Sequence, residues 1–169
     1  EVRLVGRMAY DETRVKAITA WIAGRIERLF VDYTGTPVRQ GDHLVEIYSP
    51  ELITAQEELL QALRLERDAR TSRTDLARGI AESTVLAARR KLRLLGLTAE
   101  QIAAVESGGA ASERLTVYAP LGGIVIGKDA VQGAYVEKGT RIYTIADLSK
   151  VWLLLDAYES DLARLRYGQ

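Results

Sequence analysis

Apolar residues in the middle of the chain recur at the three- and four-residue spacing of an amphipathic helix. Ser49-Pro50-Glu51 is typical of a helix start, because serine favours the N-cap, proline the first helical position, and an acidic side chain the positive end of the helix dipole. The positions that follow predict a coiled-coil seam: Leu52, Ala55, Leu59, Ala62 and, after Glu66, Ala69, widened by Ile53, Leu60 and Leu63.

A polar stretch, Thr71 to Asp75, interrupts this pattern and is predicted to be the tip of a helical hairpin. The second helix is predicted from about Leu76 to Leu95, and Gly96 suits the left-handed conformation that ends many helices. Its apolar residues include Ile80, Leu86, Ala87, Leu92 and Leu95.

A third, short helix is predicted after this hairpin, because Thr98 and Gln101 have the spacing of a capping box. The segment from Ser107 to Ser112 has the composition of a linker. Residues 49–112 are therefore expected to form a helical hairpin plus a short helix.

The segments on either side of these helices repeat each other with an offset of 98 residues. Glycine or aliphatic residues coincide at seven positions: Gly24/Gly122, Ile26/Ile124, Gly35/Gly133, Val38/Val136, Gly41/Gly139, Leu44/Ile142 and Ile47/Ile145. Short apolar runs separated by turn glycines predict β-strands. We expect residues 21–48 and 113–146 to be two halves of one β-sandwich that neither half could close alone.

Two strands of this sandwich depart from strict alternation. In Leu44-Val45-Glu46-Ile47 and Ile142-Tyr143-Thr144-Ile145, the first and last residues cannot share one face of a regular strand. Each is therefore expected to be buried partly on both faces or bent by a bulge.

The flanking segments, residues 1–20 and 147–169, are expected to contribute strands to a second β domain. Val151 to Ala157 is predicted as one apolar strand, and a helix is predicted to begin near Glu159. Because these segments do not complete a domain, we expect the chain to be part of a longer protein.

Composition excludes several classes of function. The chain is 47% hydrophobic and 27% charged, which is typical of folded proteins. Its 23 basic and 23 acidic side chains cancel, which argues against nucleic-acid binding. It has no cysteine, so disulfides and thiolate chemistry are excluded. Phosphate-loop, nucleophile-elbow and metalloprotease motifs are absent from the sequence, so we expect neither enzymatic activity nor a cofactor.

Several motifs together resemble one family. They are Gly24 to Val31, the glycine-spaced run from Gly35 to Leu44, Ile47 to Glu58, Arg93 to Ile102, Ala119 to Gly123, and Leu148 to Trp152. In this order they resemble the periplasmic adaptors, or membrane-fusion proteins, of resistance-nodulation-division (RND) heavy-metal efflux systems, in particular the copper/silver branch. The resemblance implies an α+β, multi-module fold. Its parts would be a lipoyl-like (barrel-sandwich hybrid) β-sandwich split by an α-helical hairpin, and flanking strands of a partial β-barrel domain.

The resemblance also implies partners and a location. Such adaptors bridge an inner-membrane RND transporter and an outer-membrane channel, associate with copies of themselves in a ring, here expected to be a trimer or hexamer, and lie in the periplasm at the inner membrane of Gram-negative bacteria. The expected cargo is a heavy-metal cation such as copper or silver. Hinges are expected near residues 48–49, 112–113 and 146–147, where the chain crosses between modules.

Three other functions stay open at this stage. The chain could be an adaptor of a type I secretion or ABC-linked exporter, which shares the architecture. It could be a lipoyl or biotinyl carrier domain, although Lys128 does not lie at the junction of the two halves, where a carrier has its modified lysine. It could also be a soluble metallochaperone.

The hairpin tip is the candidate site of partner contact. Its candidate residues are Arg67, Arg70, Arg73, Leu76, Arg78 and Ser83. Leu76 and Ser83 have the leucine–serine spacing found at the tip of related drug-efflux adaptors, whereas Arg73 comes one residue later than the arginine of that pattern. The alternative is a solvated, charged helix end.

Met8 and His43 are weak candidates for metal ligands. A soft-metal thioether site needs several sulfur atoms, and Met8 is the only methionine. We therefore expect the metal site of the copper/silver branch to lie outside this chain, or the cargo to differ. His43 is the only histidine and lies in a Gly-Asp-His turn, where an exposed turn residue is the simpler interpretation.

Overall fold

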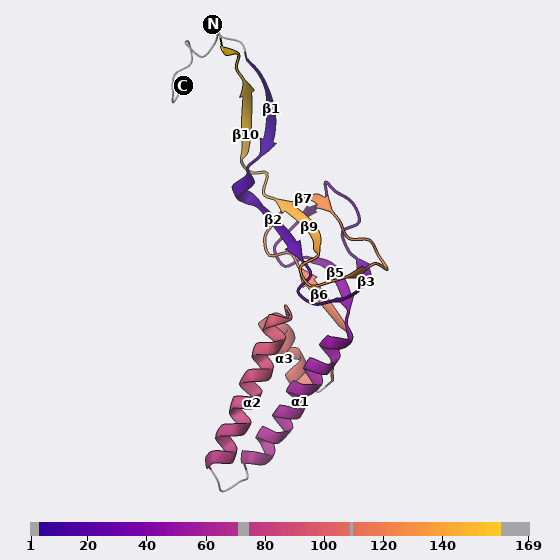
Figure 1. The fold of residues 1–169 in the computed structure, drawn as a ribbon, viewed down its shortest axis with the longest axis vertical. Coiled ribbons are helices and arrows are strands. Elements are labelled where there is room, and N and C mark those ends of the chain that lie inside the picture. The colour runs from indigo at the N-terminus through magenta and orange to yellow at the C-terminus, as the bar shows by residue number, and fades with distance from the viewer. Residues whose placement is uncertain (1–3, 71–74, 109, 160–169) are drawn as a thin grey trace.

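The computed structural model describes residues 4–70, 75–108 and 110–159 and has three parts in a row (Figure 1). A two-stranded ribbon lies at one end, a β-sandwich in the middle and the helices at the other end. The strands are β1 (Val5–Tyr10), β2 (Val15–Thr19), β3 (Gly24–Leu29), β4 (Pro37–Val38), β5 (His43–Tyr48), β6 (Arg114–Tyr118), β7 (Gly123–Lys128), β8 (Tyr135–Val136), β9 (Arg141–Ala146) and β10 (Val151–Asp156). The helices are a 3₁₀ turn, Glu12–Arg14, and α1 (Pro50–Arg70), α2 (Asp75–Leu94) and α3 (Ala99–Gly108).

The sandwich consists of two four-stranded sheets, and each takes strands from both halves of the repeat. The strand orders are β2-β9-β7-β4 and β6-β5-β3-β8. The repeat is visible in the strand bounds, since β4 and β5 return as β8 and β9 at the predicted offset of 98 residues. The predicted fold class, a lipoyl-like sandwich split by a helical hairpin, is confirmed.

The strands that depart from strict alternation contain bulges, which was one of the two predicted alternatives. Leu44, Val45 and Ile47 of β5 are all fully buried, which strict alternation does not allow. The register of β5 shifts against β6 between His43 and Val45, so successive side chains turn into the core.

The sandwich core contains one buried polar side chain from the second half of the repeat. Tyr143 is fully buried, and its hydroxyl donates a hydrogen bond of 2.7 Å to the carbonyl oxygen of Val31. Burial, with a smaller contribution from the charge of Asp32, raises the pKa of Tyr143 to about 12. In the repeat, Tyr143 of the second half occupies the position of Val45 in the first half, so the two halves of the core differ at this position.

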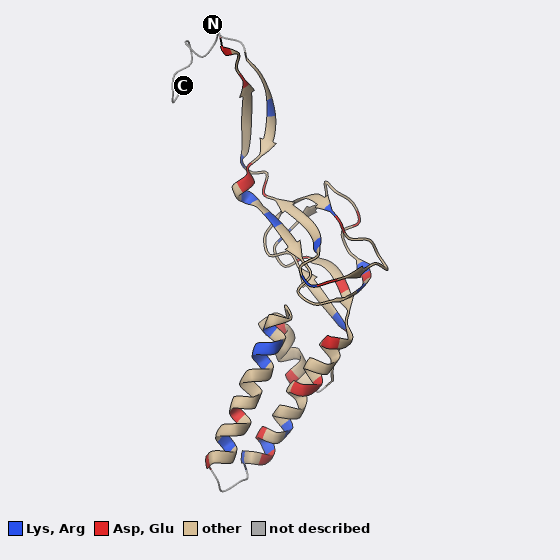
Figure 2. Cartoon of the chain, viewed as in Figure 1, with Lys and Arg blue, Asp and Glu red and all other residues tan. Residues whose placement is uncertain are grey.

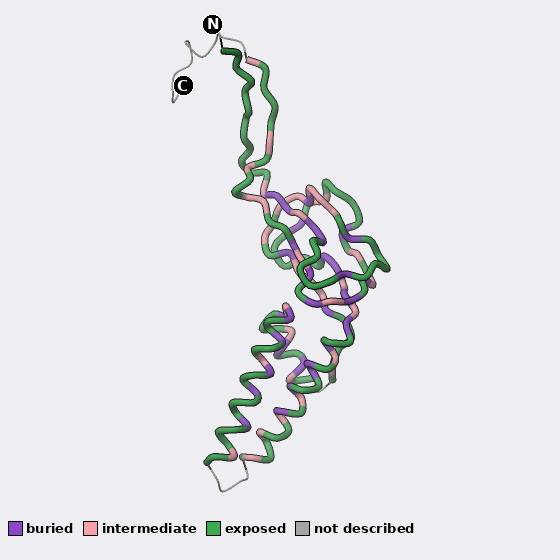
Figure 3. The backbone as a smooth tube through the Cα atoms, in the orientation of Figure 1, coloured by how far each residue is buried: buried purple, intermediate pink, exposed green. Residues whose placement is uncertain are grey.

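The ribbon pairs β1 with β10 in antiparallel register, from Val5↔Asp156 to Tyr10↔Val151. Every described residue of β10 is exposed (Figure 3). A larger β domain that covers this apolar ribbon stays a prediction.

The expected boundary at residue 20 between ribbon and sandwich was wrong. β2 pairs with β9 from Val15↔Ala146 onward and belongs to the sandwich. Sequence patterns did not separate it from β1, because both are short strands of mixed polarity.

The hairpin buries a seam between α1 and α2 in the part of both helices that is nearer the sandwich. Leu52, Ala55, Leu59 and Ala62 of α1 are buried as predicted, and α2 contributes Ala81, Val85, Ala88 and Leu92. Of the apolar residues expected in the second helix, Ile80 and Leu86 are instead 58% and 62% exposed. The seam therefore accounts for only one of two apolar stripes on α2.

The predicted helix start at Pro50, the end before Gly96 and the start after Thr98 agree with the structure. Gly96 ends the α2 segment with φ at +92°. Thr98 and Gln101 form the predicted capping box, with hydrogen bonds of 2.9 Å and 3.2 Å. α1 begins at Pro50, directly after Ser49, as predicted, but the Ser49 side chain does not cap it: the hydroxyl is fully buried and has no hydrogen-bond partner among the described residues. The N–H of Leu52, which a serine cap would use, donates to the carbonyl oxygen of Ser49 instead.

Replacement of Ser49 by alanine is expected to be neutral or to raise the melting temperature of the protein. A buried hydroxyl without a partner costs about 1–3 kcal/mol, and this variant removes that cost. The matched control is Thr98→Ala, which loses a cap bond and should cost about 1 kcal/mol. Thermal unfolding followed by circular dichroism would test both variants. A loss of stability in Ser49→Ala as large as that in Thr98→Ala would contradict this assignment.

Candidate partner-contact site

The predicted tip residues come from the end of α1 and the start of α2. Arg70 forms an ion pair with Glu66 at 3.2 Å, and Arg78 pairs with Asp75. Leu76 is 75% exposed and holds the outermost apolar position described. The two remaining described tip residues, Arg67 and Ser83, are also exposed, and Arg73 lies outside the described residues. The tip can therefore offer both charge and an apolar side chain to a partner.

A second apolar stripe on α2 was not predicted as a separate surface. Its exposed members are Leu76, Ile80, Leu86 and Leu94. Figure 3 shows buried positions on the sides of α1 and α2 that face each other and exposed positions away from that contact. A helix in a simple two-helix hairpin needs only one apolar stripe. The sequence of α2 has more apolar residues than one stripe requires, and this excess was the signal of a second surface.

Charge is divided between the two helices near the sandwich (Figure 2). This part of α1 carries Glu51, Glu57 and Glu58 without a basic residue, and the facing part of α2 carries Arg89, Arg90, Lys91 and Arg93 without an acidic one. Lys91 pairs with Glu58 at 2.7 Å, which places these two segments at the same height.

Only some of these charges are neutralised within the chain. Arg89 forms a two-point ion pair with Glu106 of α3, which raises the pKa of the arginine further. Arg90, Arg93 and Glu57 have no ion-pair partner among the described residues. Unpaired basic charge on α2 and unpaired acidic charge on α1 are therefore available to a partner.

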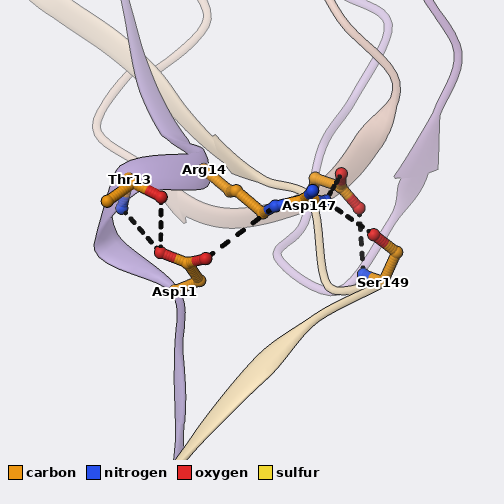
Figure 4. A network of polar contacts seen from close by, with 5 residues as sticks. All are labelled: Asp11, Thr13, Arg14, Asp147 and Ser149. Carbon is orange, nitrogen blue, oxygen red and sulfur yellow. Dashed lines mark hydrogen bonds and ion pairs between the residues drawn. The ribbon is translucent and has the colours of Figure 1, made fainter.

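A polar network joins the ribbon to the sandwich near the predicted hinge at residues 146–147 (Figure 4). Arg14 donates hydrogen bonds to Asp147 at 2.6 Å and to Ser149 at 2.8 Å. The Arg14 guanidinium also lies 3.8 Å from Asp11. A hydrogen bond from Thr13 lowers the pKa of Asp11, and hydrogen bonds from Ser149 lower the pKa of Asp147. Both carboxylates are therefore charged at neutral pH and bridge the two chain crossings through Arg14.

The weak metal candidates lie far apart in the chain and on different modules. Met8 is 72% exposed on β1. His43 is exposed on β5, with its ring 5.3 Å from that of Phe30 and 5.1 Å from that of Tyr118. Within the described part of the chain, no three histidine, aspartate or glutamate side chains gather as a metal site would require. We therefore propose no metal site on these residues.

None of the described helices has the length and apolar character that a membrane-spanning helix needs. The hairpin helices are instead amphipathic, with the buried seam and the charged faces described above.

Comparison with known proteins identifies the family to which this split lipoyl-like sandwich with an inserted helical hairpin belongs. Residues 15–146 match the family described as CusB, barrel-sandwich hybrid domain. Since this match covers more than half of the chain, the chain belongs to that family. Its sequence resemblance to heavy-metal efflux membrane-fusion proteins is thereby confirmed.

Curated relatives are similar at low identity. The chain is 26% identical to the membrane fusion protein SilB of Salmonella typhimurium over 90% of its length. It is 25% identical to the cobalt-zinc-cadmium resistance protein CzcB of Cupriavidus metallidurans over 99%, and 26% identical to the cation efflux system protein CusB of Escherichia coli over 90%. The chain spans 33–34% of the length of these relatives.

Solved structures show the same fold. ZneB from Cupriavidus metallidurans superposes with a TM-score of 0.60 at 24% identity, over 97% of this chain and 73% of that one. A MacA-MexA chimera with the α-hairpin domain of Pseudomonas aeruginosa MexA gives 0.61 at 20% identity, over 95% and 56%.

Proposed function

We propose that this chain is the central part of a periplasmic adaptor that links an inner-membrane RND transporter to an outer-membrane channel. The observation that carries the proposal is the helical hairpin inserted between two halves of a lipoyl-like sandwich, in a chain that belongs to the CusB family. The hairpin is anchored at one end only, so its tip is free to reach a partner (Figure 1).

The proposed cargo of the system is a heavy-metal cation, with copper or silver as the finer proposal. Support comes from the relatives, whose names refer to cation efflux and metal resistance. SilB and CusB are similar to this chain at 26% identity and CzcB at 25%, so sequence identity favours no single metal. The proposed role is mechanical: the adaptor holds transporter and channel together and does not itself carry the ion.

Contact between the hairpin tip and the channel can be tested by photo-crosslinking in cells from Leu76 of the full-length protein. A crosslinker there is expected to capture an outer-membrane channel subunit, identified by mass spectrometry. Tyr33, which is 69% exposed on the sandwich, is the matched control and should not capture the channel. Capture of the transporter alone from Leu76 would mean that the hairpin folds back. Capture of neither would contradict the adaptor proposal and favour the carrier or metallochaperone.

We propose further that copies of the adaptor form a ring of three or six, with α2 of one copy beside α1 of the next. The unpaired Arg90 and Arg93 of α2 lie at the same height as Glu57 of α1. Because the basic charges lie on α2 and the acidic charge lies on α1, each copy offers a basic face to one neighbour and an acidic face to the other. Such a head-to-tail contact closes into a ring when the rotation from one copy to the next divides a full turn. The exposed Leu86 and Leu94 provide apolar contact area within the same face.

Charge reversal tests this contact. Glu57→Lys or Arg90→Glu alone is expected to weaken self-association of the full-length protein about tenfold, or about 1.4 kcal/mol, because like charges then face each other. A double variant with both substitutions should restore self-association, since it rebuilds the ion pair with the charges exchanged. Lys138→Glu on an exposed sandwich loop is the control for net charge. Sedimentation would measure the association, and failure of the double variant to recover would rule out this pairing.

A further inference from the structure

The helices join the sandwich at two chain crossings that lie against each other. α1 follows β5 directly, and the N–H of Ser49 donates to the carbonyl oxygen of Glu113, where the chain returns to β6. Gln56 reinforces this contact from inside α1: its amide donates to the carbonyl oxygen of Ser112 and accepts from the N–H of Ser112, both at 2.9 Å. The two crossings are therefore held together and can act as one pivot.

A second set of contacts, away from this pivot, holds the turn between α2 and α3 on the sandwich. An added Cβ on Gly96 would lie 2.9 Å from Cβ of Trp21, so the Trp21 side chain packs on the backbone of the turn. Positive φ at Gly96 also excludes most other residues there. Trp21 lies between β2 and β3, so this contact fixes the turn to the place where the chain crosses from one sheet to the other.

Gln101 fixes the same turn to the sheet that contains β6. Its side-chain oxygen accepts the cap bond from Thr98, and its side-chain nitrogen donates to the carbonyl oxygen of Thr116 in β6 at 3.1 Å. One side chain therefore both begins α3 and ties it to the edge of the sandwich. The capping role was predicted from sequence; the bond to Thr116 was not, because it depends on the tertiary structure.

These contacts border an open groove. The groove has a volume of about 1060 Å³ and lies between the edge strands β2 and β6 and the α2–α3 turn, with Trp21, Gly96, Gln101 and Thr116 among its lining residues. Trp21 remains 55% exposed within it. The helices and the sandwich thus meet beside an open space, and Leu95 and Leu97 of the α2–α3 turn belong to one buried cluster with the seam and the sandwich core. Most members of this cluster lie on the α1–α2 seam or in the sandwich strands.

We infer that Trp21, Gly96, Gln101 and Thr116 form a latch that sets the angle of the helical hairpin to the sandwich. While the latch is closed, the predicted hinges at residues 48–49 and 112–113 are locked. When it opens, the hairpin pivots at these crossings as a rigid body, because most buried residues of the α1–α2 seam and of the sandwich lie outside the α2–α3 turn. This inference concerns the chain itself and does not rest on the proposed partners.

The latch can be opened without destroying α3. Gln101→Glu keeps a side-chain oxygen that can accept the cap bond from Thr98 but removes the N–H that Thr116 needs, and Trp21→Ala removes the ring from Gly96. Thr98→Ala is the matched control, since it weakens the cap and leaves the Gln101–Thr116 bond in place. The full chain has no cysteine, so spin labels can be attached specifically to cysteines introduced at Leu65 in α1 and Tyr33 in the sandwich.

Pulsed electron paramagnetic resonance would measure the distance distribution between the two labels. One narrow distribution is expected for the unmodified latch and for Thr98→Ala, and a distribution at least twice as broad for Gln101→Glu combined with Trp21→Ala. Far-UV circular dichroism should stay unchanged in all of them. An unchanged narrow distribution in the combined variant would overturn the inference. So would a loss of helical signal in that variant, because the contacts would then be part of the fold and not a releasable latch.

Discussion

Closure of the sandwich requires strands from both halves of the repeat, and the rest of the structure depends on this exchange. In each sheet, two neighbouring strands from one side of the helical insert lie between two strands from the other side: β5 and β3 lie between β6 and β8, and β9 and β7 lie between β2 and β4. Pairing of β5 with β6 brings the start of α1 and the end of the helical insert together at one end of the sandwich. Pairing of β2 with β9 does the same for the two ribbon strands at the other end. The long-range register thereby positions the two extensions at opposite ends of the sandwich (Figure 1).

The two junctions differ in their chemistry, and this difference bears on how the molecule could move. At the ribbon, Arg14 bridges Asp11 and Asp147 in a partly exposed ionic network. Because their carboxyl pKa values are lowered on folding, their contribution is present above the ordinary carboxyl pKa and is lost as the pH falls through the lowered values. Salt also screens such exposed pairs. At the junction between the helices and the sandwich, the neutral side-chain amides of Gln56 and Gln101 donate to backbone carbonyl groups. These hydrogen bonds are therefore insensitive to pH and to salt.

Local patterns predicted the parts of the structure that depend on local physics. Positive φ at Gly96 and the capping box at Thr98 arise from residues close in sequence, and the repeat predicted the split sandwich because glycine turns recur at a constant offset. Ser49 failed as a cap because burial against the returning chain, a tertiary effect, determined its surroundings.

The candidate surfaces were less predictable than the fold. The tip residues follow from the position of the hairpin, but which apolar residues of α2 face outward depends on the side that α1 covers. Ala81 and Val85 are buried, whereas the larger Ile80 and Leu86 are exposed, so side-chain size alone gave no guide. The bond from Gln101 to Thr116 joins residues of different modules, and no short-range pattern marks such a contact.

The most direct test of the connector role removes the hairpin and keeps the sandwich. Ser49 and Glu113 are hydrogen-bonded neighbours, so a short turn can replace residues 50–112 in the full-length protein without distortion of β5 or β6. The measurement is metal resistance of cells that carry this shortened adaptor, with binding of the transporter as the check that it is folded. The adaptor account predicts that transporter binding persists and that resistance falls to that of cells without the adaptor. Full resistance with the shortened protein would contradict it.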